Sequence, residues 1–411
     1  MGGWRGCCVV LVVLACSASR GWAERQWLLC EDGEGRFEAQ FRTGVTVLVE
    51  AAKSGGLASR RCSAELRWGE TSLAVTPTDA QVDVDVLGAD LGLGGPAVAF
   101  VLRSADDEWR ARYSIYSLEK PARPPRTITG GDNYSAEDAD FDGRIAIWTG
   151  DGAAVEGFDQ LRYADFDFAP TVVLAFRRGQ LMDVGAEYPA RYDKQIAQVR
   201  STLDAQSLRD FKQSDGALLD GSTAPATLVR LRKTKVKVLE IVWSYLNSGR
   251  QERSWRELTE DWPASDVARV RAAIVEARGK GIDAQVEGVE ESGRRFHRGR
   301  PMIFEAGAKV AKQGDHYLPG LTSMSAPTDS DDQEELVVPQ PIFLRRSKVQ
   351  AEQEEIELVI DAAGKVQRAT MAGGAKDAEA IEAAKGWKFI PAFKSGQPVA
   401  CRYLMQMFPL R

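Results

Sequence analysis

The chain has 411 residues, of which 44% are hydrophobic and 27% charged, with a formal net charge of -6. That length supports two or three domains with their own cores, and the composition excludes a disordered chain or one made mainly of membrane spans. The negative charge argues against nucleic acid as the main partner, because nucleic acids are bound through basic surfaces.

The first 23 residues have the pattern of an export signal. Arg5 precedes an apolar core at residues 7–16, and Gly21 and Ala23 are small residues suited to cleavage. The apolar core is far shorter than the roughly 20 residues that span a bilayer. We therefore expect residues 1–23 to be a signal peptide and the mature protein to be exported. Residues 13–16 also suit a lipoprotein signal, so a lipid anchor at Cys16 is the alternative to soluble export.

Two cysteines are expected to pair in the mature protein. Cys30 and Cys62 lie in its first part, and export to an oxidising compartment favours a disulfide between them. Closing a loop of that length would stabilise the fold by roughly 3–4 kcal/mol in the chain-entropy model. Cys401 is left over near the end of the chain, where we expect a small buried hydrophobic residue.

Residues 24–187 are expected to form a β-rich domain. Short runs such as residues 37–41, 45–49 and 82–86 are apolar or alternate with polar residues, and clusters of Gly, Asp and Pro separate them. This pattern is typical of short strands joined by tight turns.

The most distinctive motif of this domain is an acidic loop. Asp138, Asp140 and Asp142 are spaced two residues apart and precede Gly143, an arrangement that can place carboxylates around a calcium ion. Three Asp at a turn can equally serve as plain turn chemistry, since their side chains bond nearby backbone N–H groups. Both interpretations stay open. The loop and the following strand, residues 138–149, resemble the calcium loops of FG-GAP and VCBS repeats.

Residues 188–281 are expected to be helical, because apolar residues recur there at helical spacing. The basic run at residues 230–237 lies within this region, and we expect a solvated face. Residues 282–335 look irregular, although residues 301–305 could form a strand. The stretch 322–335 is rich in Ser, Thr, Asp and Glu, which predicts an acidic linker that separates the last part of the chain.

Known catalytic motifs are missing from the sequence. The chain has two histidines, and it contains no His-Glu-x-x-His, Gly-x-Ser-x-Gly, phosphate-binding loop or dinucleotide-binding motif. We therefore do not expect an enzyme, and we assign no catalytic residue and no cofactor other than the calcium considered above.

The last part of the chain, residues 336–411, predicts a module of strand, turn, strand, helix and strand. It resembles the TonB C-terminal domain family over about fifty residues. The matching positions are Ile356, Leu358, Ile360, Asp361, Gly364, Lys365, Val366, Ala378, Ile381, Ala383, Ala384, Lys385, Trp387, Phe389, Pro391, Ala392, Gly396, Pro398 and Val399. The whole chain is thus expected to be a multidomain α+β protein with a C-terminal ββαβ module.

The resemblance implies a function in the envelope of a Gram-negative bacterium. Such modules bind an extended segment of an outer-membrane transporter by strand addition. Carried onto this chain, the partner-binding edge is the last strand, with the residues Val399, Cys401, Arg402, Tyr403, Met405 and Met407. The first hypothesis is transport coupling. The alternative is a periplasmic or lipid-anchored interaction or structural protein without energy transduction, with or without calcium, because the short signal and short acidic linker do not span a periplasm.

Overall fold

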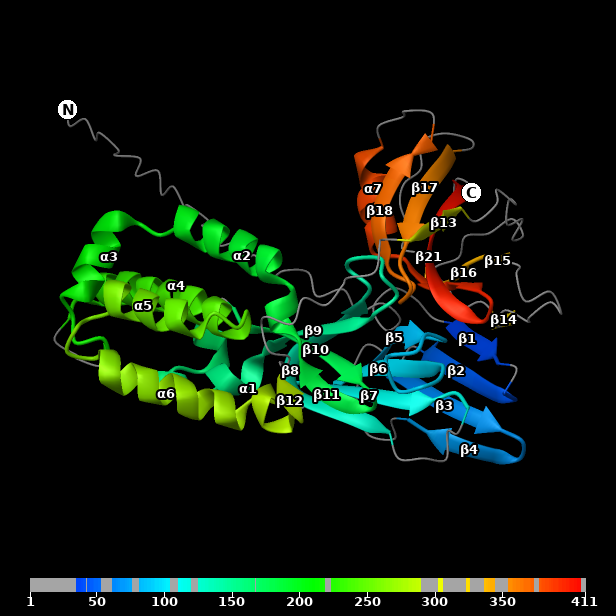
Figure 1. The fold of residues 1–411 in the computed structure, drawn as a ribbon, viewed down its shortest axis with the longest axis horizontal. Coiled ribbons are helices and arrows are strands. Elements are labelled where there is room, and N and C mark those ends of the chain that lie inside the picture. Colours follow the sequence, from blue (N-terminus) through cyan, green and yellow to red (C-terminus); the bar gives the residue numbers. More distant parts are fainter. Residues whose placement is uncertain are drawn as a thin grey trace, which may run out of the picture.

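The computed structural model is a mixed α+β structure with several sheets and, in its described part, seven α-helices. A β domain lies between a helical lobe and a C-terminal module (Figure 1). The structure describes residues 35–41, 43–52, 61–75, 81–103, 110–119, 125–166, 168–218, 223–289, 302–305, 323–325, 336–343, 354–372 and 377–407.

The β domain begins with a five-stranded sheet in the order β14-β1-β2-β3-β4. Along β2, Val45, Val47 and Val49 face one cluster of buried residues, as the period of two in a strand requires. The same cluster includes Phe100 of the second sheet, so the two sheets pack face to face. The strands are β1 (Gly35–Gln40), β2 (Val45–Ala52), β3 (Arg61–Trp68), β4 (Thr71–Ala74) and β14 (Ser323–Ser325).

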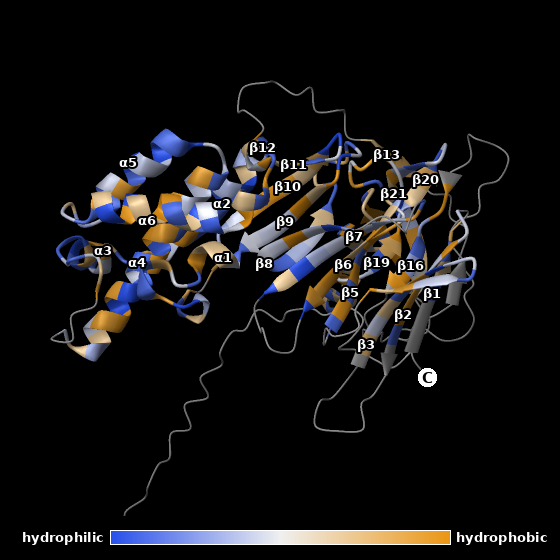
Figure 2. Ribbon diagram, turned by 90° about the horizontal axis from the view of Figure 1, so that it is seen from below, coloured by the Kyte–Doolittle hydropathy of each residue, from blue (hydrophilic) through white to orange (hydrophobic). Residues whose placement is uncertain are grey.

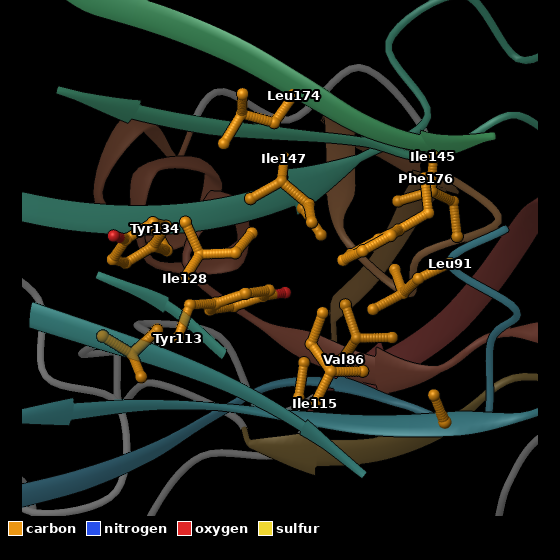
Figure 3. Packing of buried hydrophobic residues seen from close by; sticks show 14 of the residues in the cluster. Val86, Leu91, Tyr113, Ile115, Ile128, Tyr134, Ile145, Ile147, Leu174 and Phe176 are labelled. Atoms are coloured by element: carbon orange, nitrogen blue, oxygen red, sulfur yellow. The ribbon is translucent and has the colours of Figure 1, made fainter. Parts of the chain in front are cut away.

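The second sheet has eight strands and runs in chain order from β5 to β12. It curls, so that Val86 and Ile115 point toward Ile147 and Leu174 across one core (Figure 3). Neighbouring strands are antiparallel except β11 and β12. The strands are β5 (Gln81–Leu87), β6 (Ala97–Arg103), β7 (Ala111–Ser117), β8 (Arg126–Glu137), β9 (Ala146–Asp151), β10 (Thr171–Arg177), β11 (Gln180–Asp183) and β12 (Gly288–Val289).

The helical lobe is built around α4, whose second half is almost completely buried. Figure 2 shows the amphipathic colouring of these helices, which explains why they pack on one another rather than stand apart. Tyr188 and Tyr192 join the lobe to β9 and β10. The helices are α1 (Gly152–Val155), η1 (Phe158–Gln160), η2 (Tyr163–Asp165), η3 (Gly185–Glu187), α2 (Pro189–Ser201), α3 (Ala205–Lys212), α4 (Pro225–Asn247), α5 (Gln251–Asp261), α6 (Val267–Lys280) and η4 (Ile282–Gln285).

The C-terminal module has the predicted order of elements. Asp377 caps α7 by accepting a hydrogen bond from the Ala380 N–H at 2.9 Å, and α7 covers β18. The main sheet runs β15-β20-β21-β17-β18, with β13 added beside β21. The elements are β13 (Ile303–Glu305), β15 (Leu336–Val337), β16 (Gln340–Phe343), β17 (Glu354–Ile360), β18 (Val366–Met371), α7 (Ala378–Lys385), β19 (Lys388–Ile390), β20 (Ala392–Lys394) and β21 (Gln397–Met407).

The module is packed against the β domain, whereas the sequence predicted a separate unit behind a linker. Ile342 and Ile390 enter the apolar cluster between the two sheets of the β domain, and Ala363 enters the core of the curled sheet. Residues from the expected irregular region also add strands to existing sheets: β12 pairs with β11, β13 with β21 and β14 with β1. Edge strands offer unpaired N–H and C=O groups, which short extended segments satisfy.

Candidate functional site

Strand β21 was predicted to be the partner-binding edge, and its side chains alternate between core and surface. Cys401, Tyr403 and Met405 are buried in the core of the C-terminal module, while Arg402 is exposed. These three side chains are therefore core residues, so a partner could meet Cys401, Tyr403 and Met405 only through their backbone, and binding there stays a prediction. Alternate side chains of a strand lie on the same face of the sheet. The three side chains of β21 lie on the same face as the apolar side chains of the neighbouring strand β17, and both sets pack in one core. What β21 can offer a partner is its backbone and its exposed face.

One side of the β21 backbone is already paired, because β17 bonds to it from Cys401 to Met407. On the other side, β20 pairs with Gln397–Val399 and β13 pairs with Ala400–Arg402. Within the described residues, no strand pairs with Tyr403–Met407 on that second side. The expected open edge is thus occupied along its first half and open along its second half.

The strand that occupies the edge, β13, is short and partly exposed in the described part of the chain. It is three residues long and runs parallel to β21, with Ile303 opposite Ala400 and Glu305 opposite Arg402. Met302 and Ile303 are 58% and 39% exposed, which is high for large hydrophobic residues. Few buried contacts and a short ladder are the features of a weakly held segment.

Besides its pairing with β21, the β13 segment makes a backbone hydrogen bond and a cation–ring contact in the described part of the structure. The Met302 N–H donates to the Phe141 carbonyl at 2.9 Å, and the Lys394 Nζ lies 4.4 Å from the centre of the Phe304 ring. A cation at that distance over an aromatic face is attracted to it. The segment therefore touches the acidic turn on one side and β20 on the other.

Beside β13 and β21 lies a cleft of about 340 Å³, within the size range of ligand sites. It separates the C-terminal module from two turns of the β domain, and most of its lining side chains are apolar. The lining residues are Asp90, Leu91, Gly92, Phe141, Asp142, Gly143, Arg144, Ile145, Arg177, Met302, Phe304, Gln397, Pro398, Val399 and Ala400. The cleft brings together the acidic loop and strand β21, which the sequence analysis treated as unrelated motifs.

The acidic loop forms a turn closed by its own carboxylates. The Asp138 carboxylate accepts hydrogen bonds from the backbone N–H groups of Asp142 and Gly143, each at 3.0 Å. The Asp142 carboxylate accepts from the Arg144 backbone and guanidinium at 2.6–2.9 Å. Across the described ranges, no three His, Cys, Asp or Glu side chains are grouped so as to hold a metal ion. The geometry of Asp138 and Asp142 matches the turn chemistry that we weighed against calcium, and calcium binding by Asp138, Asp140 and Asp142 stays a prediction.

The charged groups at the cleft are nearly balanced. Arg144 pairs with Asp142 at 2.6 Å, and Arg144 and Arg177 lie 3.7 and 3.6 Å from the two carboxylate oxygens of Glu187. Arg144 and Arg177 thus lie with the lining carboxylates Asp90 and Asp142 and with Glu187, so the positive charges are offset. A cleft lined by apolar side chains with balanced charges suits a peptide side chain better than a free anion.

The acidic turn is tied to the C-terminal module through Asp361. The Asp138 N–H donates to the Asp361 carboxylate at 3.0 Å, and the same carboxylate accepts from the N–H groups of Ala363 and Lys365, each at 2.9 Å. Burial raises the pKa of Asp361 to about 6, and burial together with the charge of Asp361 raises the pKa of Asp138 to about 7.

The turn that carries Asp361 needs a glycine at residue 364. Gly364 has φ = +82°, and a Cβ there would lie 1.8 Å from the Phe389 carbonyl oxygen. The Phe389 N–H in turn donates to the Gly364 carbonyl at 2.9 Å. The Asp-x-x-Gly-Lys sequence, which carried the family resemblance, is therefore the piece that docks the module on the β domain.

A second buried polar group joins the same two parts. The Asp85 carboxylate accepts from Tyr113 at 2.7 Å and from the Ala136 N–H at 2.8 Å, and it pairs with Lys365. Lys388 donates to the Val84 carbonyl at 2.9 Å and lies 3.5 Å from Asp85.

The charge states of this group follow from burial and from the two lysines. Burial disfavours the charged form of Asp85, yet Lys365 and Lys388 outweigh burial and hold its pKa below the usual value. Burial and the charge of Lys365 lower the pKa of Lys388 to about 7. Sequence reasoning missed Asp85, although the alternation of Asp83 and Asp85 with valines on a strand was a visible signal.

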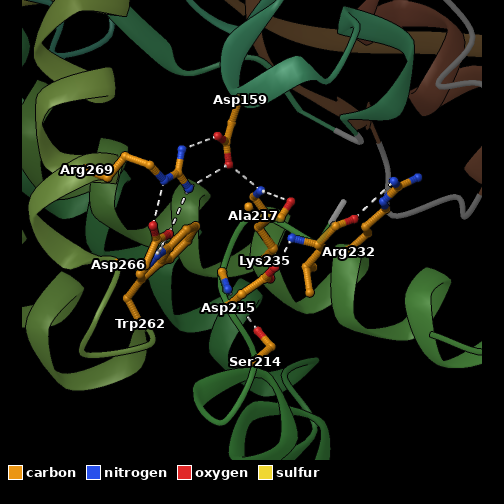
Figure 4. A network of polar contacts seen from close by, with 11 residues as sticks. Asp159, Ser214, Asp215, Ala217, Arg232, Lys235, Trp262, Asp266 and Arg269 are labelled. Carbon is orange, nitrogen blue, oxygen red and sulfur yellow. Dashed lines mark hydrogen bonds and ion pairs between the residues drawn. The ribbon is translucent and has the colours of Figure 1, made fainter. Parts of the chain in front are cut away.

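A third polar network lies in the helical lobe (Figure 4). Asp159 pairs with Lys235 and with Arg269, which also binds Asp266 at 2.6 Å. Lys235 is 1% exposed, so the solvated face predicted for residues 230–237 is wrong at this position. The lysine is buried because η1 brings Asp159, at φ = 50°, over helix α4.

This network contacts backbone and side chains of the lobe itself. Lys235 also donates to the Ala217 carbonyl at 3.2 Å, and Trp262 donates to Asp266 at 2.9 Å. Burial lowers the pKa of Lys235, and Asp159 opposes that effect. The donors and acceptors satisfy one another, which is the arrangement of a structural clamp.

The cysteine predictions fall partly outside the described residues. Cys62 is buried on β3 and is disulfide-bonded, while Cys30, Cys16 and the whole segment 1–23 lie outside the described residues. Cys401 is buried, as expected for a small core residue.

Comparison of the chain with protein-family models, curated proteins and solved structures found no match. Among the helices that the structure describes, none has the length and apolar character needed to cross a membrane.

Proposed function

We propose that the protein is an exported binding protein of the Gram-negative envelope, and that its C-terminal module takes up an extended segment of a partner protein by strand addition on β21. The segment of an outer-membrane transporter is the partner class that the resemblance implies. The observation that carries the proposal is β13: the edge of β21 already accepts an extended three-residue strand from a distant part of the chain. The adjoining apolar cleft supplies a place for side chains of such a segment.

We further propose that binding, rather than energy transduction, is the role of the module. Asp361 and Asp85 fix it to the β domain through buried hydrogen bonds and ion pairs. A module held in this way moves with the whole protein, which does not suit a flexible coupler that reaches across the periplasm. This supports the alternative of an envelope interaction protein over transport coupling.

The test uses the full chain and synthetic peptides that copy the N-terminal periplasmic segments of outer-membrane transporters from the same organism. Amide hydrogen exchange, measured by mass spectrometry, is compared with and without each peptide. We expect slower exchange within Tyr403–Met407, because added strand pairing would protect amides on the open half of the edge.

Strand β18 is the internal control, since it pairs with β17 and is the last strand of its sheet in the described part. Protection of Val366–Met371 instead of Tyr403–Met407 would move the binding edge to β18. Unchanged exchange at both strands, with every peptide at saturating concentration, would contradict strand addition as the function.

A further inference from the structure

We infer that β13 is an internal ligand of the partner site: it occupies the β21 edge in place of the partner and must leave before the partner can bind there. The inference rests on the proposed function, and it names both the competitor and the kind of segment that replaces it. That segment runs parallel to β21, carries an unbranched apolar residue at the position of Met302 and carries an aromatic residue at the position of Phe304.

The first support is the overlap of the two sites. β13 pairs with Ala400–Arg402, directly before the open stretch Tyr403–Met407 on the same side of the strand. An incoming strand long enough to use the open stretch and the cleft would meet β13 end to end or replace it. If it replaces β13, the incoming strand can form the same backbone hydrogen bonds to Ala400–Arg402, because backbone pairing does not depend on sequence.

The second support is that β13 is held weakly. Its ladder covers three residues, and Ile303 is 39% exposed. A single short strand gains little from burial, so the free energy that keeps it on the edge is small. A partner with more residues in contact can therefore displace it.

The side chains that the β13 segment places in the cleft indicate which residues the displacing segment should carry. Met302 and Phe304 are two residues apart, so they lie on one face of the strand, and both line the cleft. Lys394 lies 4.4 Å from the centre of the Phe304 ring. An aromatic residue at this position is favoured because the ammonium group is attracted to the ring face.

The experiment measures binding of a fluorescent peptide that copies residues 300–307 to the full chain by anisotropy. In wild type the internal strand competes, so the apparent affinity is reduced by the fraction of molecules whose edge is free. Phe304→Ala weakens the internal strand, and we expect the peptide to bind about tenfold more tightly. Val289→Ala, at an exposed position of β12, is the matched control and leaves the affinity unchanged.

A second pair of measurements tests the contact to Lys394. In the Phe304→Ala background, adding Lys394→Ala should weaken binding about 2- to 5-fold, because the ring of the peptide then takes the place of the Phe304 ring beside Lys394. The peptide that carries Ala in place of its Phe should bind the Phe304→Ala protein more weakly by a similar factor and should not respond to Lys394→Ala.

Thermal melts of each variant check that the fold is retained, and Met302→Ala gives a second weakened internal strand with the same expected direction. Equal affinity of the peptide for wild type, Phe304→Ala and Met302→Ala would overturn the inference, and so would absence of binding to every variant. Either result leaves the proposed function to be decided by the hydrogen-exchange experiment, in which transporter peptides protect β21 or do not.

Discussion

The helical lobe and the C-terminal module each use a buried lysine–aspartate pair, but the pair of the lobe lies within the lobe, whereas that of the module joins it to the β domain. In the lobe, Lys235 pairs with Asp159 beside a large aromatic cluster that includes Phe158 and Trp243. At the module, Lys365 and Lys388 share Asp85 of the β domain, and Ile342 and Ile390 enter the apolar cluster of that domain.

The lobe and the module differ in the contacts that remain when one charged residue of the buried pair is replaced. The lobe keeps its aromatic core, and Asp159 keeps Arg269. The module loses the common acceptor of two lysines at once. Because an unpaired buried charge costs much more than a lost surface contact, we expect the module to depend on its polar anchor more than the lobe does.

The largest expected effect is that of Asp85→Ala, which leaves Lys365 and Lys388 without their carboxylate and also frees Tyr113. Removing one partner of a buried ion pair costs about 3–5 kcal/mol. We expect a loss of that size in the free energy of unfolding, measured by urea denaturation. Glu276→Ala breaks an exposed pair with Lys280 and should leave the free energy of unfolding nearly unchanged. Similar losses in the two variants would contradict the buried anchor.

The next effect is a pH dependence from Lys388, whose pKa is lowered to about 7 in the folded protein. Between pH 7 and the usual lysine value the unfolded chain holds more protons than the folded one, so stability rises with pH in this window. Lys388→Met should remove that rise, on the order of 2–3 kcal/mol. Urea denaturation from pH 7 to 10 measures it, with Lys280→Met as the exposed control. A rise that is equally steep in Lys388→Met would refute the assignment.

The smallest of the three is Lys235→Met in the helical lobe. Asp159 keeps its pairs with Arg269, and the methionine side chain keeps most of the packing. We expect a loss of about 1–2 kcal/mol in the free energy of unfolding, below that of Asp85→Ala. Lys233→Met is the matched control on the exposed face of the same helix and should be near neutral. A loss larger than that of Asp85→Ala would reverse the comparison between lobe and module.

Much of the local structure could be predicted because it depends on residues close in sequence. The helix from Ala378 to Lys385 follows from its apolar spacing and from Asp377 as its cap. The turn at Gly364 follows from the need for a positive φ. Tyr403 and Met405 were assigned to one face of β21 by the period of two, although which face is buried depends on β17.

The candidate site could not be predicted because its parts are far apart in the chain. Phe304 and Phe141 line one cleft with Val399, and nothing in the spacing of these residues indicates that they meet. Residues 301–305 were predicted as a possible strand, but the sequence does not indicate which of several sheet edges that strand pairs with. Likewise, the sequence of the acidic turn suits both calcium and turn chemistry, and only the structure shows that Gly143 N–H and Arg144 bond to its carboxylates.

The sequence by itself determined the class of the fold, the order of elements in the C-terminal module and the residues that turn and cap them, since these depend on local propensity and periodicity. The tertiary structure decided that the module is fixed to the β domain through Asp361 and Asp85, that Lys235 is buried, and that β13 lies on the β21 edge. These features depend on which distant surfaces bury each other, and the free energy of such burial is set by the partner surface as much as by the residue itself.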